Sequence, residues 1–347
     1  MSDFKLGIFG SGQLGRMLIQ AAADYGISCH LYAPDAHTSS AGQICAEITQ
    51  ANYDDGDALR AFYSTIDGVT SEFENIPTIA LETAPATCNV SPGIAALATA
   101  QNRLEEKAVA NNLGIPTTKY WPVESASELA SALISLGGKG VLKTARMGYD
   151  GRGQIRVNTE DDAAKVWQDL NTDTAILEMF VPFTYEVSFL IARAKTGKVS
   201  IFPPTLNQHK DGILAHSVAP AKLAPSMLEA GRLYCQKMAE HLNLVGLLAM
   251  ELFVTDNNHL IFNEIAPRPH NSFHWTIEGC QTSQFHQLVR CVAGLPLGAV
   301  NSDKIWHMDN ILGQDSATLT TALAEPGKYV HNYGKGEARN DRKMGHI

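Results

Sequence analysis

Short apolar runs separated by glycine-rich or helical segments mark the first hundred residues. Runs typical of buried strands lie at residues 4–9, 28–33 and 68–73. A helix should follow the first run after a glycine-rich turn and reach about Tyr25, and Pro77 is well placed to open another helix. Strands alternating with helices at this spacing predict a doubly wound parallel sheet over residues 1–98.

From about Gln101 the pattern changes to longer strands, which indicate an α+β region with antiparallel pairs. Strands are expected at 117–122, 140–144, 175–180, 185–194, 199–203 and 212–219, and helices at 102–112, 125–136 and 225–241. Beyond residue 300, the candidate strands 306–312 and 329–333 predict a small β-rich unit. The chain is therefore expected to divide into residues 1–98, 99–298 and 299–347.

The composition is that of an ordinary globular protein. Of 347 residues, 45% are hydrophobic and 18% charged, and the net charge of -9 excludes a general electrostatic footprint for nucleic acid or an anionic membrane. Six scattered cysteines without a C-x-x-C pair predict reduced thiols in a cytoplasmic protein. The N-terminus enters a strand directly and no apolar run approaches membrane-spanning length, so we expect neither a signal peptide nor a membrane span.

The segment 249–265 has two arms rich in β-formers and predicts a hairpin. If Asn257 and Asn258 form a two-residue turn, Glu251 lies directly opposite Glu264 on one face. Two carboxylates at a Cβ separation of about 5 Å repel each other, and a divalent cation between them would turn the repulsion into a binding site. The alternative is a surface hairpin with two solvated glutamates. Because Mg²⁺ takes few protein carboxylates and fills its shell with phosphate oxygens and water, the pair suggests a magnesium–nucleotide site.

The turn Gly10-x-Gly12-x-x-Gly15 lies between a predicted strand and a predicted helix, which suits a phosphate group. A dinucleotide site would also need an acidic residue at the end of the next strand, and Asp35 instead follows Pro34 in a loop. Another phosphate-bearing ligand is favoured, and a purely structural turn stays as the alternative.

A second candidate phosphate site begins at Lys143, which ends an apolar strand before the glycine-rich loop 146–154. A lysine and backbone N–H groups are suitable phosphate ligands, and the glycines would let the loop close as a lid. The spacing is not that of a Walker P-loop, and a plain glycine-rich hairpin is the alternative.

Acidic and basic side chains elsewhere are weaker candidates. Glu178 and Glu186 could hold an adenine amine or ribose hydroxyls, or could be solvated turn residues. Four histidines, His209, His216, His270 and His274, lack zinc-ligand spacing, and as isolated residues we interpret most of them as structural or surface residues. A basic patch or a solvated tail is formed near the C-terminus by Lys335, Arg339, Arg342 and Lys343.

Taken together, these features resemble the ATP-grasp superfamily, and more narrowly its 5-(carboxyamino)imidazole ribonucleotide synthases. The strings that carry the resemblance are Gly-Ser-Gly-Gln-Leu-Gly-Arg-Met (10–17), Glu-Phe-Glu-Asn-Ile-Pro (72–77), Gly-Tyr-Asp-Gly-Arg-Gly-Gln (148–154), Glu-Val-Ser (186–188), Asn-Gln-His-Lys-Asp-Gly-Ile-Leu (207–214), Asn-Glu-Ile-Ala-Pro-Arg-Pro-His-Asn-Ser (263–272) and Asp-Arg-Lys-Met-Gly-His (341–346). They run in order along nearly the whole chain. The resemblance implies an ATP-grasp fold with a Rossmann-like N-terminal domain and a small β-rich C-terminal domain.

The resemblance also implies site residues. For ATP these are Arg103, Lys143, Gly148, Tyr149, Asp150, Gly151, Arg152, Gly153, Gln154, Glu178, Met179, Phe180, Val181, Glu186, His209, Asn263 and Glu264. Glu251 and Glu264 would bind Mg²⁺, with Mn²⁺ as an alternative metal. For aminoimidazole ribonucleotide they are Gly12, Gln13, Leu14, Glu74, Tyr149, Asp150, Arg152, His270, Asn271, Lys335, Arg342 and Lys343. The implied catalytic residues are Arg268, Lys143 and Asp150, with Asp150 as proton acceptor.

The implied activity is ATP-dependent carboxylation of the ribonucleotide with bicarbonate through carboxyphosphate, in a homodimer. Ala266 stands where many ATP-grasp enzymes have Asn, which agrees with this branch and argues against biotin carboxylase. The family usually continues past the Gly-His pair, so the C-terminal domain is expected to be incomplete at Ile347. Two alternatives stay open: a purine-pathway ligase that uses formate or an amino acid, and a nucleotide-sensing module without turnover.

Overall fold

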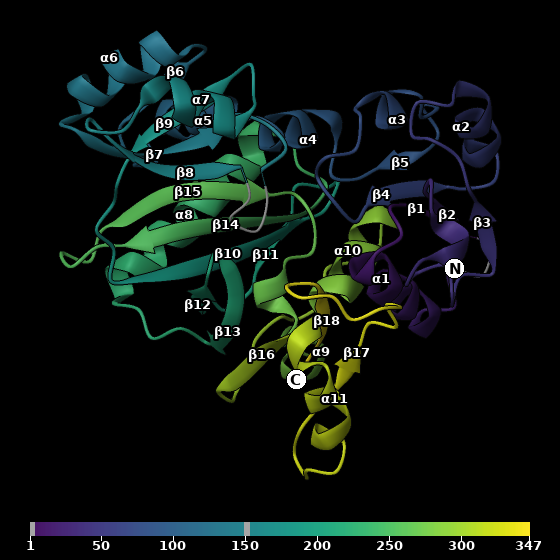
Figure 1. The fold of residues 1–347 in the computed structure, drawn as a ribbon. Coiled ribbons are helices and arrows are strands. Elements are labelled where there is room, and N and C mark those ends of the chain that lie inside the picture. Colours follow the sequence, from purple (N-terminus) through teal and green to yellow (C-terminus); the bar gives the residue numbers. More distant parts are fainter. Residues whose placement is uncertain (1–3, 149–152) are drawn as a thin grey trace.

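A computed structural model describes residues 4–148 and 153–347, and its strands form three sheets (Figure 1). The N-terminal sheet has the order β3-β2-β1-β4-β5 and is parallel throughout. Its strands are β1 (Lys5–Phe9), β2 (Ser28–Tyr32), β3 (Glu47–Thr49), β4 (Gly68–Ser71) and β5 (Asn89–Val90). The predicted doubly wound parallel sheet is confirmed. The third predicted strand stops at Ser71, two residues early, so Glu72 and Glu74 lie in the loop after it.

The helices of this part are α1 (Gln13–Asp24), α2 (Gly56–Tyr63), α3 (Ile79–Glu82) and α4 (Ile94–Ala100). α1 buries Leu14 and Leu18 in the largest core cluster, whereas α2 buries Phe62 in a second cluster on the sheet's other side. The prediction that Pro77 opens a helix is off by two residues, because α3 begins at Ile79 after Thr78.

A four-stranded antiparallel sheet comes next, with the order β6-β9-β7-β8. Its strands are β6 (Tyr120–Val123), β7 (Lys139–Thr144), β8 (Gln154–Asn158) and β9 (Ala175–Met179). The helices α6 (Ala126–Leu136) and α7 (Ala163–Leu170) pack on it over a core that includes Leu133, Leu142 and Leu177. Lys143 at the end of β7 pairs with Gln154 at the start of β8.

The remaining strands form a nine-stranded antiparallel sheet with the order β15-β14-β10-β12-β13-β16-β18-β17, and β11 pairs with β10 beside this path. Its strands are β10 (Tyr185–Arg193), β11 (Val199–Ile201), β12 (Thr205–Lys210), β13 (Ile213–Ala219), β14 (Gly246–Val254), β15 (Leu260–Ala266), β16 (Trp306–Leu312), β17 (His331–Asn332) and β18 (Lys343–His346). β12 was not predicted, because its polar end, Gln208 to Lys210, is exposed and carries no apolar alternation. The C-terminal strands continue this sheet through the β13–β16 pair.

The remaining helices are α5 (Arg103–Asn112), α8 (Pro225–His241), α9 (Thr276–Gly279), α10 (Gln284–Val292) and α11 (Ala317–Ala322). α8 packs on β10 and β14, and α10 lies between this sheet and α1 of the N-terminal part (Figure 1). Within residues 4–148 and 153–347, no helix is both long and apolar enough to cross a bilayer.

Candidate functional site

A cavity of about 1420 Å³ opens where the three sheets meet, and most of the predicted site residues line it. Its walls come from the loop after β4, the ends of β7 and β9, the faces of β10, β12, β14 and β15, and the loop after β15. Predicted residues that line it are Gln13, Leu14, Glu74, Arg103, Lys143, Gly148, Gln154, Glu178, Met179, Phe180, Val181, Glu186, His209, Glu251, Asn263, Glu264, Arg268, His270, Asn271 and Lys343. Tyr149, Asp150, Gly151 and Arg152 lie outside the described residues.

The carboxylate pair of the hairpin is in register: Glu251 on β14 is the cross-strand partner of Glu264 on β15. The route to this register differs from the prediction. Thr255 pairs with His259, so the turn has three residues instead of two, and its last residue Asn258 has a positive φ of 60°. The three pairs nearest the turn are shifted by one position from the predicted register. A β-bulge between Leu252 and Glu251 restores the predicted register at Glu251.

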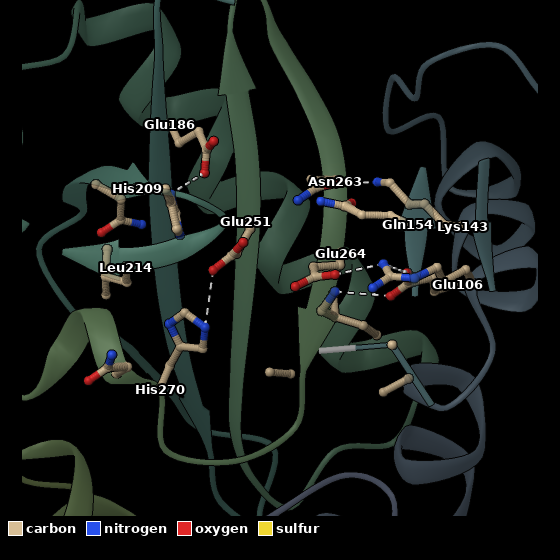
Figure 2. Close-up of a pocket in the computed structure, with 18 of the residues that line it drawn as sticks. Glu106, Lys143, Gln154, Glu186, His209, Leu214, Glu251, Asn263, Glu264 and His270 are labelled. Atoms are coloured by element: carbon tan, nitrogen blue, oxygen red, sulfur yellow. Dashed lines mark hydrogen bonds and ion pairs between the residues drawn. The ribbon is translucent and has the colours of Figure 1, made fainter. Parts of the chain in front are cut away.

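The bulge residue is Asn263, which has no partner of its own between the pairs Leu252–Phe262 and Glu251–Glu264. In a regular strand, consecutive side chains point to opposite faces, but here both Asn263 and Glu264 line the cavity. The Asn263 Oδ1 lies 3.5 Å from Lys143 Nζ. The bulge therefore adds a carboxamide to the carboxylate pair (Figure 2).

The donor set of this pair suits Mg²⁺. Glu251 and Glu264 extend from neighbouring strands into the same space (Figure 2), with the Asn263 amide oxygen nearby. No group of three or more His, Cys, Asp or Glu side chains among the described residues is arranged to hold a metal. Mg²⁺ requires no such group, because one or two carboxylates together with nucleotide phosphate oxygens complete its shell.

Each of the two carboxylates already has one basic neighbour. Arg103 Nη1 lies 2.7 Å from Glu264 Oε2, and His270 Nε2 lies 3.1 Å from Glu251 Oε1. Burial raises the pKa of Glu251, but the hydrogen bond and charge of His270, with the charges of His209 and Arg268, outweigh burial and hold the pKa at about 2. Glu251 is therefore ionised and ready to bind a cation at neutral pH.

Lys143 is held by a buried chain of charges that the sequence did not reveal. Its Nζ lies 2.8 Å from Glu178 Oε2, and Lys107 Nζ lies 3.0 Å from the other oxygen. Lys107 is fully buried and its Nζ also donates to the carbonyl of Asn263 at 3.1 Å. Burial raises the pKa of Glu178, but the two lysines outweigh it and hold the pKa at about 2. Glu178, predicted to contact adenine or ribose, is 3% exposed and bound to both lysines.

Glu106 is the second group that the sequence did not reveal. It lines the cavity beneath Glu264 at 1% exposure, and its carboxylate accepts the Ile265 N–H at 3.0 Å. Burial raises the pKa of Glu106 to about 8. The negative charge of Glu264 adds to this rise, and the positive charge of Arg103 opposes it.

Apolar side chains form a slot in another part of the cavity wall. Met179, Phe180 and Phe183 are partly exposed there, and Phe183 stacks on Phe253 with ring centroids 4.6 Å apart. Such a slot suits a flat aromatic base.

Polar side chains lie beside this slot. His209 Nδ1 is 2.8 Å from Glu186 Oε2, and this contact outweighs burial and raises the pKa of His209 above its usual value.

The end of the cavity near the N-terminal sheet is charged. Arg268 binds Glu74 through two hydrogen bonds, from Nε and from Nη2 (3.1 Å). Burial raises the pKa of Glu74, but Arg268 outweighs it and holds the pKa at about 2. Within the described residues, neither polar atom of the Asn271 carboxamide has a hydrogen-bond partner, although both atoms are buried. An anionic or polar substrate group would find donors here.

The glycine-rich turn is occupied by a carboxylate from the chain itself. The N–H groups of Gly12 and Gly15 both donate to Glu72, the latter at 2.6 Å. A Cβ on Gly10 would lie 2.4 Å from Glu72 Cγ, and one on Gly12 would lie 2.7 Å from its Oε1. Burial raises the pKa of Glu72 although both hydrogen bonds lower it. The turn predicted to bind a phosphate therefore binds the carboxylate of Glu72 instead. Gln13 and Leu14 line the cavity, but Gly12 does not.

Other predicted residues lie away from the cavity wall. Gly153, Lys335 and Arg342 do not line it, and Arg342 Nη1 donates to the Glu337 carbonyl at 2.9 Å. His216 binds Asp309 at 2.7 Å, and His274 is fully buried. The structural or surface roles predicted for His216 and His274 agree with these positions.

Known protein families match the chain in three segments. Residues 3–101 match the ribonucleotide synthetase preATP-grasp domain, 108–285 the ATP-grasp domain, and 307–347 the phosphoribosylaminoimidazole carboxylase C-terminal domain.

Whole relatives match as well. The N5-carboxyaminoimidazole ribonucleotide synthase of Brucella melitensis is 43% identical, over 99% of this chain and 95% of the relative. The bifunctional purine synthesis protein purC/E of Dictyostelium discoideum is 40% identical, and this chain spans 36% of its length.

Solved structures share the fold. An ADP complex of the N5-carboxyaminoimidazole ribonucleotide synthetase purK is 37% identical, with a TM-score of 0.94 over 100% of this chain and 92% of the other. The synthase of Aspergillus clavatus, in complex with ADP and 5-aminoimidazole ribonucleotide, is 29% identical, with a TM-score of 0.92 over 100% and 94%.

Proposed function

The chain belongs to the ATP-grasp ligases, in the family of N5-carboxyaminoimidazole ribonucleotide synthases, and we propose a division of its site residues for that reaction. It is an ATP-dependent enzyme that carboxylates 5-aminoimidazole ribonucleotide, with formation of ADP and phosphate, in purine biosynthesis. The single observation that carries the division of roles is the Glu251–Glu264 pair, placed beside Asn263, Arg103 and Lys143 in one cavity.

ATP lies with its base in the apolar slot and its phosphates beside Lys143 and Arg103. Residues proposed to contact it are Arg103, Lys143, the loop 148–154, Met179, Phe180, Val181, Glu186 and His209. Glu178 acts from behind Lys143, since its carboxylate already binds two ammonium groups. Glu251 and Glu264 hold Mg²⁺, which when bound screens the phosphate charges and withdraws electrons from the transferred group.

Bicarbonate is the proposed carbon source. Its oxygen attacks the γ-phosphorus, the bond to the β,γ-bridging oxygen breaks, and carboxyphosphate and ADP form. Lys143 and Arg103 stabilise the developing negative charge, so their contribution is mainly electrostatic. Arg268, at the other end of the cavity, stabilises carboxyphosphate in place of its present partner Glu74.

Carboxyphosphate then releases CO₂ and phosphate inside the cavity, where exclusion of water protects it. The exocyclic amine of the ribonucleotide attacks CO₂, a C–N bond forms, and the amine loses one proton. Asp150 is the proposed acceptor of that proton. Glu74, His270, Asn271 and Lys343 face the ribonucleotide, and Lys335 and Arg342 approach its phosphate when it is bound.

The proposal extends to organisation. The domains are residues 1–98, 99–298 and 299–347, the assembly is a homodimer, and the protein works in the cytoplasm. These statements are open to sedimentation velocity, limited proteolysis and cell fractionation.

The test of the proposed function is ADP release from purified protein with MgATP, with bicarbonate or the ribonucleotide omitted in turn. Release that needs the ribonucleotide and rises with bicarbonate, together with an acid-labile carboxylated product, is the expected result. Glu264→Gln should abolish most of the release. Release driven by formate or an amino acid, or bound ATP without turnover, would contradict the proposal.

A further inference from the structure

We infer that Gln284 is a positioning residue for the carboxylate of Glu251 and acts through the backbone of His270. Gln284 is the first residue of α10 and does not line the cavity. No feature of its sequence context predicts a role in the site. The inference rests on the proposed function in one respect, the role of Glu251 as a metal ligand.

The Gln284 side chain is fully buried and makes three hydrogen bonds. Its Oε1 accepts the His270 N–H at 2.8 Å, and its Nε2 donates to the His270 carbonyl at 2.9 Å. Nε2 also donates to His274 Nδ1 at 3.0 Å. The carboxamide therefore binds both backbone groups of one residue, which fixes the position and rotation of that peptide segment.

His270 transmits this constraint to the metal site. Its Nε2 lies 3.1 Å from Glu251 Oε1 (Figure 2). Its Nδ1 lies 2.6 Å from Ser272 Oγ, so both ring nitrogens are engaged. With the backbone clamped and the ring held at both nitrogens, His270 can present Nε2 to Glu251 in one orientation. Partners behind a metal ligand orient it and affect metal affinity.

The clamp is itself supported from the C-terminal strands. The His274 ring is fully buried, stacks on Phe285, and lies 4.9 Å from the His346 ring. Tyr333 Oη lies 2.9 Å from His346 Nδ1. Burial lowers the pKa of His274 well below its usual value, so its neutral ring can accept the Gln284 hydrogen bond. The loop that carries His270 is thus anchored to rigid, packed elements.

The chain contains a matched control three residues further along the same helix. Gln287 is also fully buried, its Nε2 donates to the Gly298 carbonyl at 3.0 Å, and its Oε1 accepts the Gly298 N–H at 2.9 Å. The two glutamines make the same pair of bonds to a loop backbone. Neither Gln287 nor Gly298 lines the cavity, so only the Gln284 clamp leads to the metal carboxylate.

The test compares Gln284→Leu with Gln287→Leu in the full chain. Mn²⁺ binding in the presence of ADP is followed by electron paramagnetic resonance, and the Mg²⁺ dependence of ADP release is measured in parallel. Gln284→Leu should weaken Mn²⁺ binding about 10-fold and raise the half-saturating Mg²⁺ concentration by the same factor. Gln287→Leu should lower the melting temperature to a similar extent and leave both metal constants within about twofold of wild type.

A second variant protects the test against misfolding. Gln284→Glu keeps the size and the acceptor for the His270 N–H but loses both donated bonds, and it should also weaken Mn²⁺ binding. Unchanged Mn²⁺ affinity in both Gln284 variants, or an equal loss in Gln287→Leu, would overturn the inference. Because Mn²⁺ binding requires no turnover, failure of the proposed carboxylation leaves this measurement interpretable.

Discussion

Removal of the carboxylate at Glu72 should open the glycine-rich turn to external anions. In the structure the Gly12 and Gly15 N–H groups both donate to this carboxylate at the N-terminus of α1. Hydrogen bonds to a charged group contribute about 1.5–3 kcal/mol each, so the gross loss in Glu72→Ala is roughly 3–6 kcal/mol. The cost of burying the carboxylate, which also raises the pKa of Glu72, offsets part of the stabilisation that these hydrogen bonds give. A net loss of about 2 kcal/mol lowers the melting temperature by roughly 3 °C if the 347-residue chain unfolds as one unit, at an unfolding entropy of about 2.1 cal/mol/K per residue.

The assay is the melting temperature of wild type and Glu72→Ala in sulfate and in chloride at matched ionic strength. Sulfate stabilises most proteins by exclusion from their surface, so only the difference between the two proteins is informative. An anion bound in the vacated turn at 100 times its Kd would restore about 2.7 kcal/mol, and Glu72→Ala should therefore gain more from sulfate than wild type does. Equal gains in both proteins, or a variant as stable as wild type in chloride, would refute the assignment of Glu72 as the anion of this turn.

Four further outcomes are expected. Lys107→Met should lower the free energy of unfolding by about 3–5 kcal/mol, because it breaks a buried ion pair, and the double variant with Glu178→Gln should cost less than the sum of the single changes in a denaturant cycle. Glu264→Gln should reduce ADP release about 100-fold or more in a coupled assay, with wild-type rates disproving the metal role. Because burial raises the pKa of Glu106 to about 8, its contribution to stability is present at acidic pH and is lost as pH rises from about 4 to about 8. Glu106→Gln should flatten this decline in melting temperatures between pH 5 and 9. Lys343→Ala should raise the KM for the ribonucleotide about 10-fold and leave the KM for ATP within about twofold, and a selective ATP defect would contradict its placement.

The hairpin shows how far local pattern reaches. Its arms rich in β-formers and its polar turn predicted two paired strands with Glu251 opposite Glu264, and that pair is observed. The predicted two-residue turn was wrong, and a three-residue turn combined with the bulge at Asn263 arrives at the same register. The turn conformation at Asn258 depends on neighbouring residues. A bulge, by contrast, depends on the groups that pack against each face of the strand, and those groups come from outside the hairpin.

Two charged residues of α5 show where local pattern fails. Glu106 and Lys107 are almost completely buried, yet such residues are normally exposed unless they are paired. Their partners are Ile265, Glu178 and the carbonyl of Asn263, all more than 70 positions further along the chain. The helix itself was predicted over residues 102–112, but the reason for its buried charges was not.

The sequence by itself determined the elements with strong periodicity, the parallel N-terminal sheet, the family, and just under half of the residues that line the cavity. These follow from short-range patterns and from motif strings in a fixed order. Tertiary structure alone decided that Glu72 fills the glycine turn, that Glu178 binds both Lys143 and Lys107, and that Gln284 clamps His270. Each of these contacts pairs a buried polar group with a partner from a distant segment. Because an unpaired buried polar group is costly, each of these groups must have a partner. Only the packing of the sheets decides which residue that partner is.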